Sequence, residues 1–406
     1  MGFHERFGLT PVINACGKMT RLSNARALPE VIRLASESLE HFFLADELQA
    51  LASRRIAAFS GAEAGCVTAC AAAGITLSVA AAMTGTDPAL VERLPDTEGM
   101  KNEVVIQKGH AVNFGAPITQ MIRLAGARPV EAGNVNGTTP AQMAAAIGER
   151  TAAVLFVVSH HTAQYGCVPL AETVRIAHAR GVPVIVDGAA QSFNLRRIVA
   201  AGADLAVCSG HKYLSGTVSG LVCGRRHLVE AVLMQNQGIG RPMKVGKEGI
   251  FGLIAALEAR ERLDVAAFSA EVRERVEKVR AGLAGRPGVT IAVAEDPNGN
   301  PFCRARVFVD GAAAGLDARA VVRAAAGHRP AVILRGHHVD EGYFDVDVVE
   351  LNPEELEITI RTLQGIFDAD GEKKAAWQGG SATDPRFQWL GSVPPAPGRP
   401  AGEAAR

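Results

Sequence analysis

The chain has 406 residues, of which 48% are hydrophobic and 21% charged, and its 42 Lys and Arg residues balance its 42 Asp and Glu residues. This length suits two modest domains, and the zero net charge argues against broad electrostatic binding to nucleic acid or to an anionic membrane. The seven cysteines lack disulfide or zinc-site spacing, and no signal core or membrane span is evident, so we expect a cytoplasmic protein without a bound metal.

Helix and strand patterns alternate along the first part of the chain. Apolar residues recur at helical spacing over residues 29–43, 47–59, 73–85 and 169–181. Short runs rich in β-branched residues, bounded by turn formers, predict strands over residues 103–107, 152–159, 182–187 and 204–209. Nearly continuous apolar strands that alternate with helices are typical of a mostly parallel α/β sheet with helices on both faces.

The pattern changes after residue 255. Residues 253–285 predict one or two long charged helices, and the runs GVTIAVAED, RARVFVDG, AVILRGHH and LEITIRTL predict strands of a smaller α/β domain. From Asp370 the chain is polar and rich in Gly and Pro, which predicts a tail that is loose or lies along the surface. We therefore expect an N-terminal segment 1–50, a large domain 51–255, a small C-terminal domain 256–369 and a tail 370–406.

An aspartate and a lysine follow two of the predicted strands. Asp187 ends VPVIVD, and Lys212 follows DLAVCS in the stretch SGHK. Because ligands of open parallel sheets bind beyond the carboxyl ends of the strands, both side chains should face one crevice. A lysine held neutral there can form a Schiff base with an aldehyde, and a carboxylate can keep a pyridinium nitrogen protonated. Together they suit pyridoxal phosphate (PLP), although each residue alone is more often a cap or a surface residue.

A phosphate group would need hydrogen-bond donors at a helix start. Ala71, Ala72, Ala73 and Gly74 lie at a turn into a predicted helix, where exposed amides and the helix dipole attract an anion. Ser209, three residues before the lysine, adds a hydroxyl. Close helix packing is the commoner reason for such small residues, so the order of all these signals, rather than any one of them, favours PLP.

The chain resembles fold-type-I PLP enzymes of the aminotransferase class V group, in the branch around selenocysteine synthase and D-glucosaminate-6-phosphate ammonia-lyase. VDGAAQ and SGHK carry the likeness to the superfamily, and GRPMKVGKE is more specific for the lyase-like branch. INACGKMT and KGHAVNFGAPI add to it, and the likeness covers about residues 8 to 365. It implies a fold-type-I architecture, a mostly parallel central sheet with helices on both faces plus a smaller C-terminal α/β domain.

The resemblance also implies roles for the residues at the strand ends. Lys212 would carry the Schiff base and move the substrate's α-proton, Asp187 would pair with the pyridine nitrogen, and His110 would lie against the cofactor ring. Gln191 would reach the phenolic oxygen or cap a helix, and His211 would contact the phosphate or shape the lysine's loop. The phosphate would take backbone donors from Ala71, Ala72, Ala73 and Gly74.

Basic residues elsewhere are candidates for binding an anionic group. The resemblance places GRPMKVGKE near a dimer interface, which implies a homodimer, or a higher oligomer, with shared active sites. A solvated basic loop and a solvent-facing strand arginine are the alternatives for these residues. The candidates for the substrate or phosphate anion are Arg241, Lys244 and Lys247 in that stretch, Arg361 on the strand expected at ITIRTL, and His161 as lining of the active site.

The lyase-like motifs favour a small anionic amino acid as substrate. We expect Lys212 to remove the α-proton, followed by loss of a β-hydroxyl as water and release of a 2-keto acid and ammonia. An aldolase, racemase or aminotransferase with the same cofactor, and a non-catalytic PLP-binding protein, are the alternatives. A cysteine desulfurase would need a nucleophilic Cys on a mobile loop; no Cys lies on an evident loop of that kind, and only Cys303 in GNPFCRAR is left open. The neutral charge argues against a transfer RNA substrate.

Overall fold

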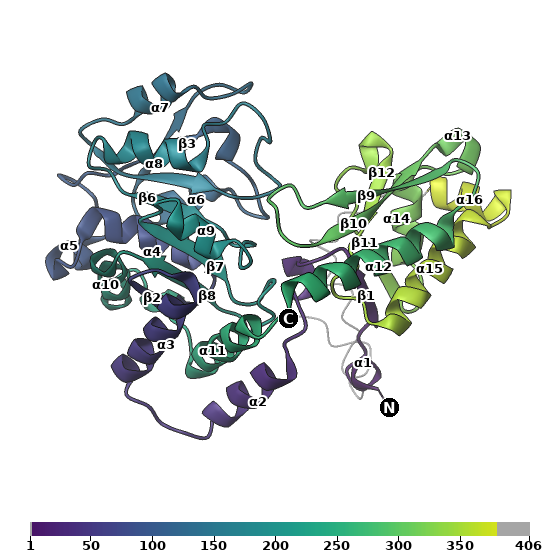
Figure 1. Cartoon of the computed structure of the whole chain (residues 1–406), viewed down its shortest axis with the longest axis horizontal. Coiled ribbons are helices and arrows are strands. Elements are labelled where there is room, and N and C mark those ends of the chain that lie inside the picture. Colours follow the sequence, from purple (N-terminus) through teal and green to yellow (C-terminus); the bar gives the residue numbers. More distant parts are fainter. Residues whose placement is uncertain (1, 380–406) are drawn as a thin grey trace, which may run out of the picture.

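The computed structural model describes residues 2–379, which form two lobes joined side by side (Figure 1). The large lobe is built on a seven-stranded sheet in which only β8 runs antiparallel to its neighbours. The prediction of an α/β fold with a mostly parallel sheet is therefore confirmed. In sheet order the strands are β2 (Ala64–Thr68), β8 (Gly220–Gly224), β7 (Leu205–Ser209), β6 (Val184–Asp187), β5 (Thr151–Val157), β3 (Glu103–Gln107) and β4 (Arg128–Ala132).

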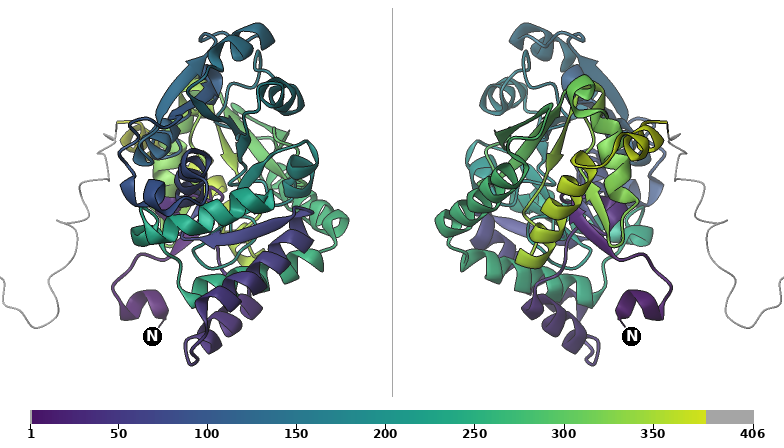
Figure 2. Two further views of the ribbon diagram at one scale, coloured as in Figure 1. Left: turned by 90° about the vertical axis from the view of Figure 1, so that its left-hand side faces the viewer. Right: turned by 90° about the vertical axis from the view of Figure 1, so that its right-hand side faces the viewer.

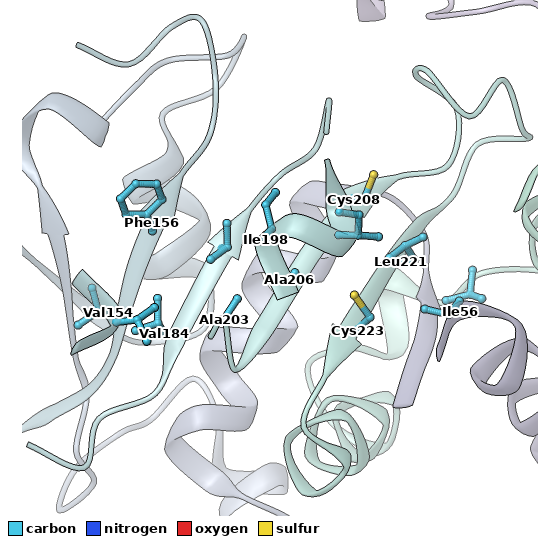
Figure 3. Close-up of a cluster of buried hydrophobic side chains, with 14 of the residues drawn as sticks. Ile56, Val154, Phe156, Val184, Ile198, Ala203, Ala206, Cys208, Leu221 and Cys223 are labelled. Carbon is cyan, nitrogen blue, oxygen red and sulfur yellow. The ribbon is translucent and has the colours of Figure 1, made fainter. Parts of the chain in front are cut away.

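Helices cover both faces of this sheet because successive strand residues point to opposite sides. On β5, Val154 and Phe156 join one buried cluster, whereas Ala153 and Leu155 join the other. One face carries α4 (Ala71–Thr84), α6 (Ile118–Leu124) and α10 (Arg226–Met234). The other carries α3 (Ala45–Ser60), α7 (Pro140–Ala146), α8 (Leu170–His178), α9 (Leu195–Ala200) and α11 (Lys247–Glu261), and Figure 3 shows part of its core.

The small lobe has an antiparallel sheet in the order β12-β10-β9 and a parallel pair, β1 with β11. A bridge between Arg335 and Asp345 links the two. The N-terminal strand β1 therefore belongs to the C-terminal lobe, whereas α2 (Pro29–Ser38) packs on α11 of the large lobe. The bounds are β1 (Val12–Ala15), β9 (Val289–Glu295), β10 (Cys303–Val309), β11 (Ala331–Leu334), β12 (Tyr343–Val346), α12 (Val265–Leu283), α13 (Gly311–Ala314), α14 (Ala318–Ala326), α15 (Pro353–Phe367) and α16 (Gly371–Gln378).

One predicted strand of the small lobe is wrong. LEITIRTL lies in helix α15, which begins with a capping box between Asn352 and Glu355 and with Pro353 in its first turn. Leu356, Ile360 and Leu363 are buried at helical spacing, and this pattern prevails over the β-branched residues between them. Figure 2 shows α15 and α16 on the outer side of the small lobe.

The predicted tail begins with a helix rather than a loose segment. Helix α16 packs against α14, and its Lys374 donates to the carbonyl of Ala314 at 2.9 Å. Residues 380–406 of the predicted tail lie outside the described residues. The division into four segments given above stays a prediction. No helix in the described part is long and apolar enough to cross a membrane.

Candidate active site

Asp187 lies at the carboxyl end of β6, in the middle of the large sheet. Its Oδ1 accepts a hydrogen bond from the Ala189 amide at 2.9 Å, and within residues 2–379 its Oδ2 has no hydrogen-bond partner. Burial raises the pKa of the Asp187 carboxyl, whereas the Ala189 amide and the Lys212 ammonium lower it. The free carboxylate oxygen can therefore accept a bond from a cationic N–H donor in the crevice.

Lys212 lies in the turn that follows the next strand, β7. Asp187 is in register with Val207 on that strand, so the two strand ends meet at one edge of the sheet. The turn is closed by backbone bonds from Gly216 to Gly210 at 2.8 Å and from Ser215 to Lys212 at 3.0 Å. The Lys212 side chain is half-buried, and it forms no ion pair with any residue that the structure describes.

His211 and Ser209 hold this turn together. His211 Nδ1 lies 3.1 Å from the Ser219 carbonyl oxygen and 3.3 Å from Ser209 Oγ, and burial lowers the pKa of the imidazole. Of the two roles weighed for His211, these contacts match the shaping of the lysine's loop. Gln191 is buried close by, and its Oε1 accepts a bond from Asn194 at 2.9 Å.

His110 ends the short helical turn that directly follows β3, and it is almost fully buried. Its Nδ1 accepts a hydrogen bond from the Val157 amide at 3.1 Å, and its ring meets Phe156 edge to face at 4.5 Å between centroids. Burial lowers the pKa of His110 to about 4. The imidazole is therefore neutral at physiological pH, with Nε2–H as its remaining donor.

The first turn of α4 provides backbone amides. Those of Ala71 and Ala72 have no partner among the described residues, whereas the Ala73 amide donates to Cys70 Sγ at 3.4 Å. The Gly74 amide already donates to the Cys70 carbonyl, so the donor role predicted for Gly74 is wrong. Close packing of α4 on the sheet favours a glycine at position 74, because an added Cβ would lie 2.9 Å from Val207 Cγ1.

A guanidinium from the small lobe reaches the loop that follows β5, at the edge of the sheet where the crevice was predicted. Arg335, directly after β11, is buried and donates from Nη2 to His160 Nε2 at 2.6 Å and from Nη1 to the Cys16 carbonyl at 3.3 Å. Within the described ranges, it has no carboxylate close enough for an ion pair. His161 follows His160, and the pKa of its imidazole is lowered first by burial and then by the charges of Arg335 and Lys212.

The histidines beside Arg335 are neutral. Burial and then Arg335 lower the pKa of His160 to about 2 and that of His337 to about 4. The rings of His160 and His161 lie 3.9 Å apart, and His337 lies about 6 Å from each of them, at 6.2 and 6.1 Å. Arg335 is therefore the positive charge of this wall of the crevice, and the imidazoles contribute polar contacts without charge.

The predicted anion-binding residues are not all brought to this crevice. Arg361 is exposed on α15, so its predicted role as a strand arginine that clamps a substrate carboxylate is wrong. Lys247 donates to the carbonyls of Leu39 and His41 at 3.1 and 2.6 Å. Arg241 and Lys244 are exposed and line a separate groove of about 930 Å³ beside α3 and α10, which Lys212 does not line.

The donor set of the crevice fits PLP. A buried carboxylate with one free oxygen, a half-buried lysine at the neighbouring strand end and free amides at a helix start match the ring nitrogen, the aldehyde and the phosphate. The three groups come from β6, the turn after β7 and α4, which pack on one another.

Comparison with known proteins agrees with this donor set. Residues 47–271 match the family described as SelA: L-seryl-tRNA selenium transferase. D-glucosaminate-6-phosphate ammonia lyase of Salmonella typhimurium is 38% identical over 365 residues, which cover 90% of this chain and 98% of that protein. The chain belongs to the SelA family. The predicted resemblance to fold-type-I PLP enzymes of this branch is thereby confirmed.

Other relatives of this chain are named for different reactions. The 5'-C-glycyluridine monooxygenase-decarboxylase of a Streptomyces species is 39% identical over 90% of this chain and 92% of its own length. The L-seryl-tRNA(Sec) selenium transferase of Nitratidesulfovibrio vulgaris is 31% identical over only 47% of this chain. A solved structure of D-glucosaminate-6-phosphate ammonia-lyase matches 92% of this chain and 99% of its own with a TM-score of 0.82 at 36% identity.

Arg335 was not among the residues predicted from the sequence. The run AVILRGHH was predicted only as a strand of the small domain, and nothing local shows that its arginine is buried. The signal that identifies Arg335 is its place directly after a small-lobe strand, whereas Arg361 had been predicted to lie on such a strand.

Replacing Arg335 tests whether it binds a substrate anion. We expect Arg335→Lys to raise the substrate KM by about 10- to 100-fold with a smaller effect on kcat, because lysine keeps the charge but cannot make a two-pronged contact. Arg306→Lys is the matched control, because Arg306 is partly exposed and already paired with Asp345 at 2.9 Å. Equal KM values for the two variants in steady-state assays would remove Arg335 from the binding site.

Proposed function

We propose that this chain is a PLP-dependent lyase that acts on a small anionic β-hydroxy amino acid and releases a 2-keto acid and ammonia. The observation that carries the proposal is that Asp187, with its free carboxylate oxygen, and Lys212 lie at the ends of adjoining strands. The choice of a lyase is supported by the relative named as an ammonia lyase, which this chain matches over nearly its whole length. A cytoplasmic location stays a prediction from the sequence.

When bound, PLP withdraws electrons from the amino acid's α-carbon. Asp187 would hold a proton on the ring nitrogen, the amides of Ala71 and Ala72 would bind the phosphate, and neutral His110 would lie against the ring. Lys212 takes the α-proton and passes it to the departing β-hydroxyl, which leaves as water. The enamine product then takes up water and loses ammonia, so that one amino acid gives one keto acid and one ammonia.

Arg335 binds the substrate carboxylate in this proposal. Its guanidinium is buried and is oriented by His160, in the loop after β5, and by the carbonyl of Cys16. The charges of Arg335 and Lys212 both lower the pKa of His161. The charge of a substrate carboxylate would therefore be matched by a cation whose hydrogen bonds in the described chain go to neutral groups, with Asp347 as the carboxylate that it influences electrostatically. His161 would line the opposite side of the substrate.

We also propose a homodimer in which Arg241 and Lys244 serve the partner's site. Both are exposed and line a groove away from Lys212 of their own chain. Phe42, beside this groove, is fully exposed, and an exposed aromatic side chain next to an apolar groove is typical of a subunit contact.

An assay of products separates the lyase from its alternatives. We expect purified protein with added PLP to release ammonia and a 2-keto acid in equal amounts from D-glucosaminate 6-phosphate or another β-hydroxy amino acid, without oxygen uptake. Ammonia and keto acid are measured with coupled dehydrogenases, and oxygen with an electrode. Oxygen uptake with carbon dioxide release would favour the second candidate, an oxidative decarboxylase, which the relative from Streptomyces supports.

The same assay detects the other reactions open to this cofactor. A keto acid without free ammonia would indicate an aminotransferase, an aldehyde would indicate an aldolase, and a change of optical rotation alone would indicate a racemase. Absence of any PLP-dependent absorbance band would contradict the proposal as a whole.

A further inference from the structure

Tyr213, the residue directly after Lys212, is held by an unusual number of contacts. Its ring stacks on Phe302 at 4.5 Å between centroids with an interplanar angle of 27°. Its hydroxyl oxygen accepts a hydrogen bond from Arg304 Nη2 at 3.2 Å. Its carbonyl accepts a bond from the guanidinium of Arg260, and the ammonium of Lys18 lies 5.5 Å from the ring centroid. Tyr213 is therefore fixed through its ring, its hydroxyl and its backbone.

The partners of Tyr213 come from outside the large sheet. Arg304 is on β10 and Phe302 directly precedes that strand, so both belong to the small lobe. Tyr213 itself is counted in the buried core of the small lobe, although its chain neighbours belong to the large lobe. The turn that carries Lys212 thus reaches into the small lobe at this one side chain.

Arg304 is itself fixed by carboxylates. Its Nε donates to Asp347 Oδ2 at 2.8 Å, and its Nη1 lies 3.5 Å from Asp296 Oδ2. All three side chains are buried, so the guanidinium has little freedom to follow the tyrosine if the tyrosine moves. The hydrogen bond to Tyr213 therefore joins the turn to a rigid, charged part of the small lobe.

The other contacts of the turn stay within the large lobe. His211 and Ser219 close it on one side, and the amide of Leu28 donates to the Ser215 carbonyl at 3.1 Å on the other. Burial raises the pKa of the Tyr213 phenol, because the ionised form would be desolvated, so this group is a neutral acceptor and takes no proton from the reaction.

We propose that Tyr213 and Arg304 are positioning residues that tie the turn of Lys212 to the small lobe. This inference rests on the proposed function, in which Lys212 must reach both the cofactor and the α-proton. The small lobe also supplies Arg335, which in that proposal binds the substrate. The contact between Tyr213 and Arg304 thus fixes the distance between the group that moves the proton and the group that holds the substrate.

The test uses Tyr213→Phe, which removes one hydroxyl and keeps the ring stacked on Phe302. The matched control is Tyr343→Phe on β12, because Tyr213 and Tyr343 are equally buried at 9% exposure and both have arginine neighbours. In the cofactor-free protein, we expect hydrogen exchange of the amides in residues 210–219 to become about tenfold faster in Tyr213→Phe only, because a hydrogen bond from a charged donor is lost. Exchange in the remaining sheet should stay unchanged.

The same variants are compared in the cofactor-loaded enzyme. We expect Tyr213→Phe to lower kcat about tenfold with KM nearly unchanged, since the lysine is displaced and the substrate anchor is intact. The pH midpoint of the visible absorbance band should shift in this variant and not in Tyr343→Phe. Arg304→Lys, which keeps the charge beside Asp347 but loses the planar fork, should reproduce all three effects.

The exchange measurement needs no cofactor, so it separates this inference from the proposed function. Equal exchange in Tyr213→Phe and Tyr343→Phe would overturn the anchoring of the turn. Faster exchange without a change in kcat or in the absorbance midpoint would overturn the positioning role. A wild-type protein without a PLP-dependent band would overturn the proposed function and, with it, the catalytic meaning of the contact.

Discussion

Lys212→Ala should abolish covalent attachment of PLP and lower turnover by about 10³-fold or more, because one side chain both holds the cofactor and moves the α-proton. Wild-type protein incubated with PLP should develop an absorbance band in the near-visible range. Reduction with borohydride should then fix the cofactor on the peptide that contains Lys212, as mass spectrometry of a digest would show.

Lys108→Ala is the control for this experiment. Lys108 also follows a strand of the large sheet, but its ammonium pairs with Glu131 at 2.8 Å on the surface. This variant should keep the absorbance band and the labelled peptide. Two results would show that Lys212 is not the attachment point. One is labelling of another lysine instead in the wild type, and the other is an unchanged amount of bound cofactor after reduction of Lys212→Ala.

Asp187→Asn should lower turnover by about 10²-fold or more while leaving PLP able to bind. The amide has the shape of the carboxylate but lacks the negative charge that keeps a ring nitrogen protonated, and a missing electrostatic partner in a buried site has an effect of this order. Stopped-flow absorbance of the loaded enzyme after mixing with substrate measures the effect. Asp204→Asn would not serve as a control. Asp204 pairs with Arg225 and His178 at the opposite end of the strands, so its replacement would affect the stability of the fold.

The same substitution should make the cofactor-free protein at least as stable as the wild type. Folding raises the pKa of Asp187, so the ionised carboxylate lowers the free energy of unfolding once the pH exceeds the unfolded pKa of about 3.9. This loss grows until the pH passes the folded pKa, and the neutral amide avoids it. Thermal unfolding at neutral pH and at pH 4 should therefore show a larger gain for Asp187→Asn at neutral pH. If Asp187→Asn instead lost stability at neutral pH, by as much as at pH 4 or more, the Asp187 carboxylate would not be destabilising in the folded protein.

The part of the site on the large sheet could be predicted because its signals are local. Strand β3 was predicted with its exact bounds, and the strands that end at Asp187 and Ser209 are continuous apolar runs followed by turn formers. In a parallel sheet the carboxyl ends of neighbouring strands meet, so the sequence order alone brings Asp187 and Lys212 to one edge. Strand β8 was missed because its glycines at both ends resemble a loop.

The small-lobe part of the site could not be predicted because it depends on contacts between distant segments. Arg335 reaches the crevice through the pairing of β11 with β1 and through His160 from the other lobe. Arg361 was favoured instead because ITIRT is rich in β-branched residues, although the capping box before it is the stronger signal. The sequence gives no signal for the contact between Tyr213 and Arg304, because nothing near either residue identifies the other as its partner.

The pairing of Val12 with Ala331 has a consequence for synthesis on the ribosome. The first strand of the chain has no partner until the last part of the small lobe has left the ribosome, whereas the strands of the large sheet are all made by residue 224. Because domains generally fold as they emerge, the large lobe can complete its sheet first, with the N-terminal strand waiting unpaired. The carbonyl of Cys16, which follows that strand, orients Arg335 only after this late pairing. A nascent chain can therefore form the strand ends that carry Asp187 and Lys212 before Arg335 is in place.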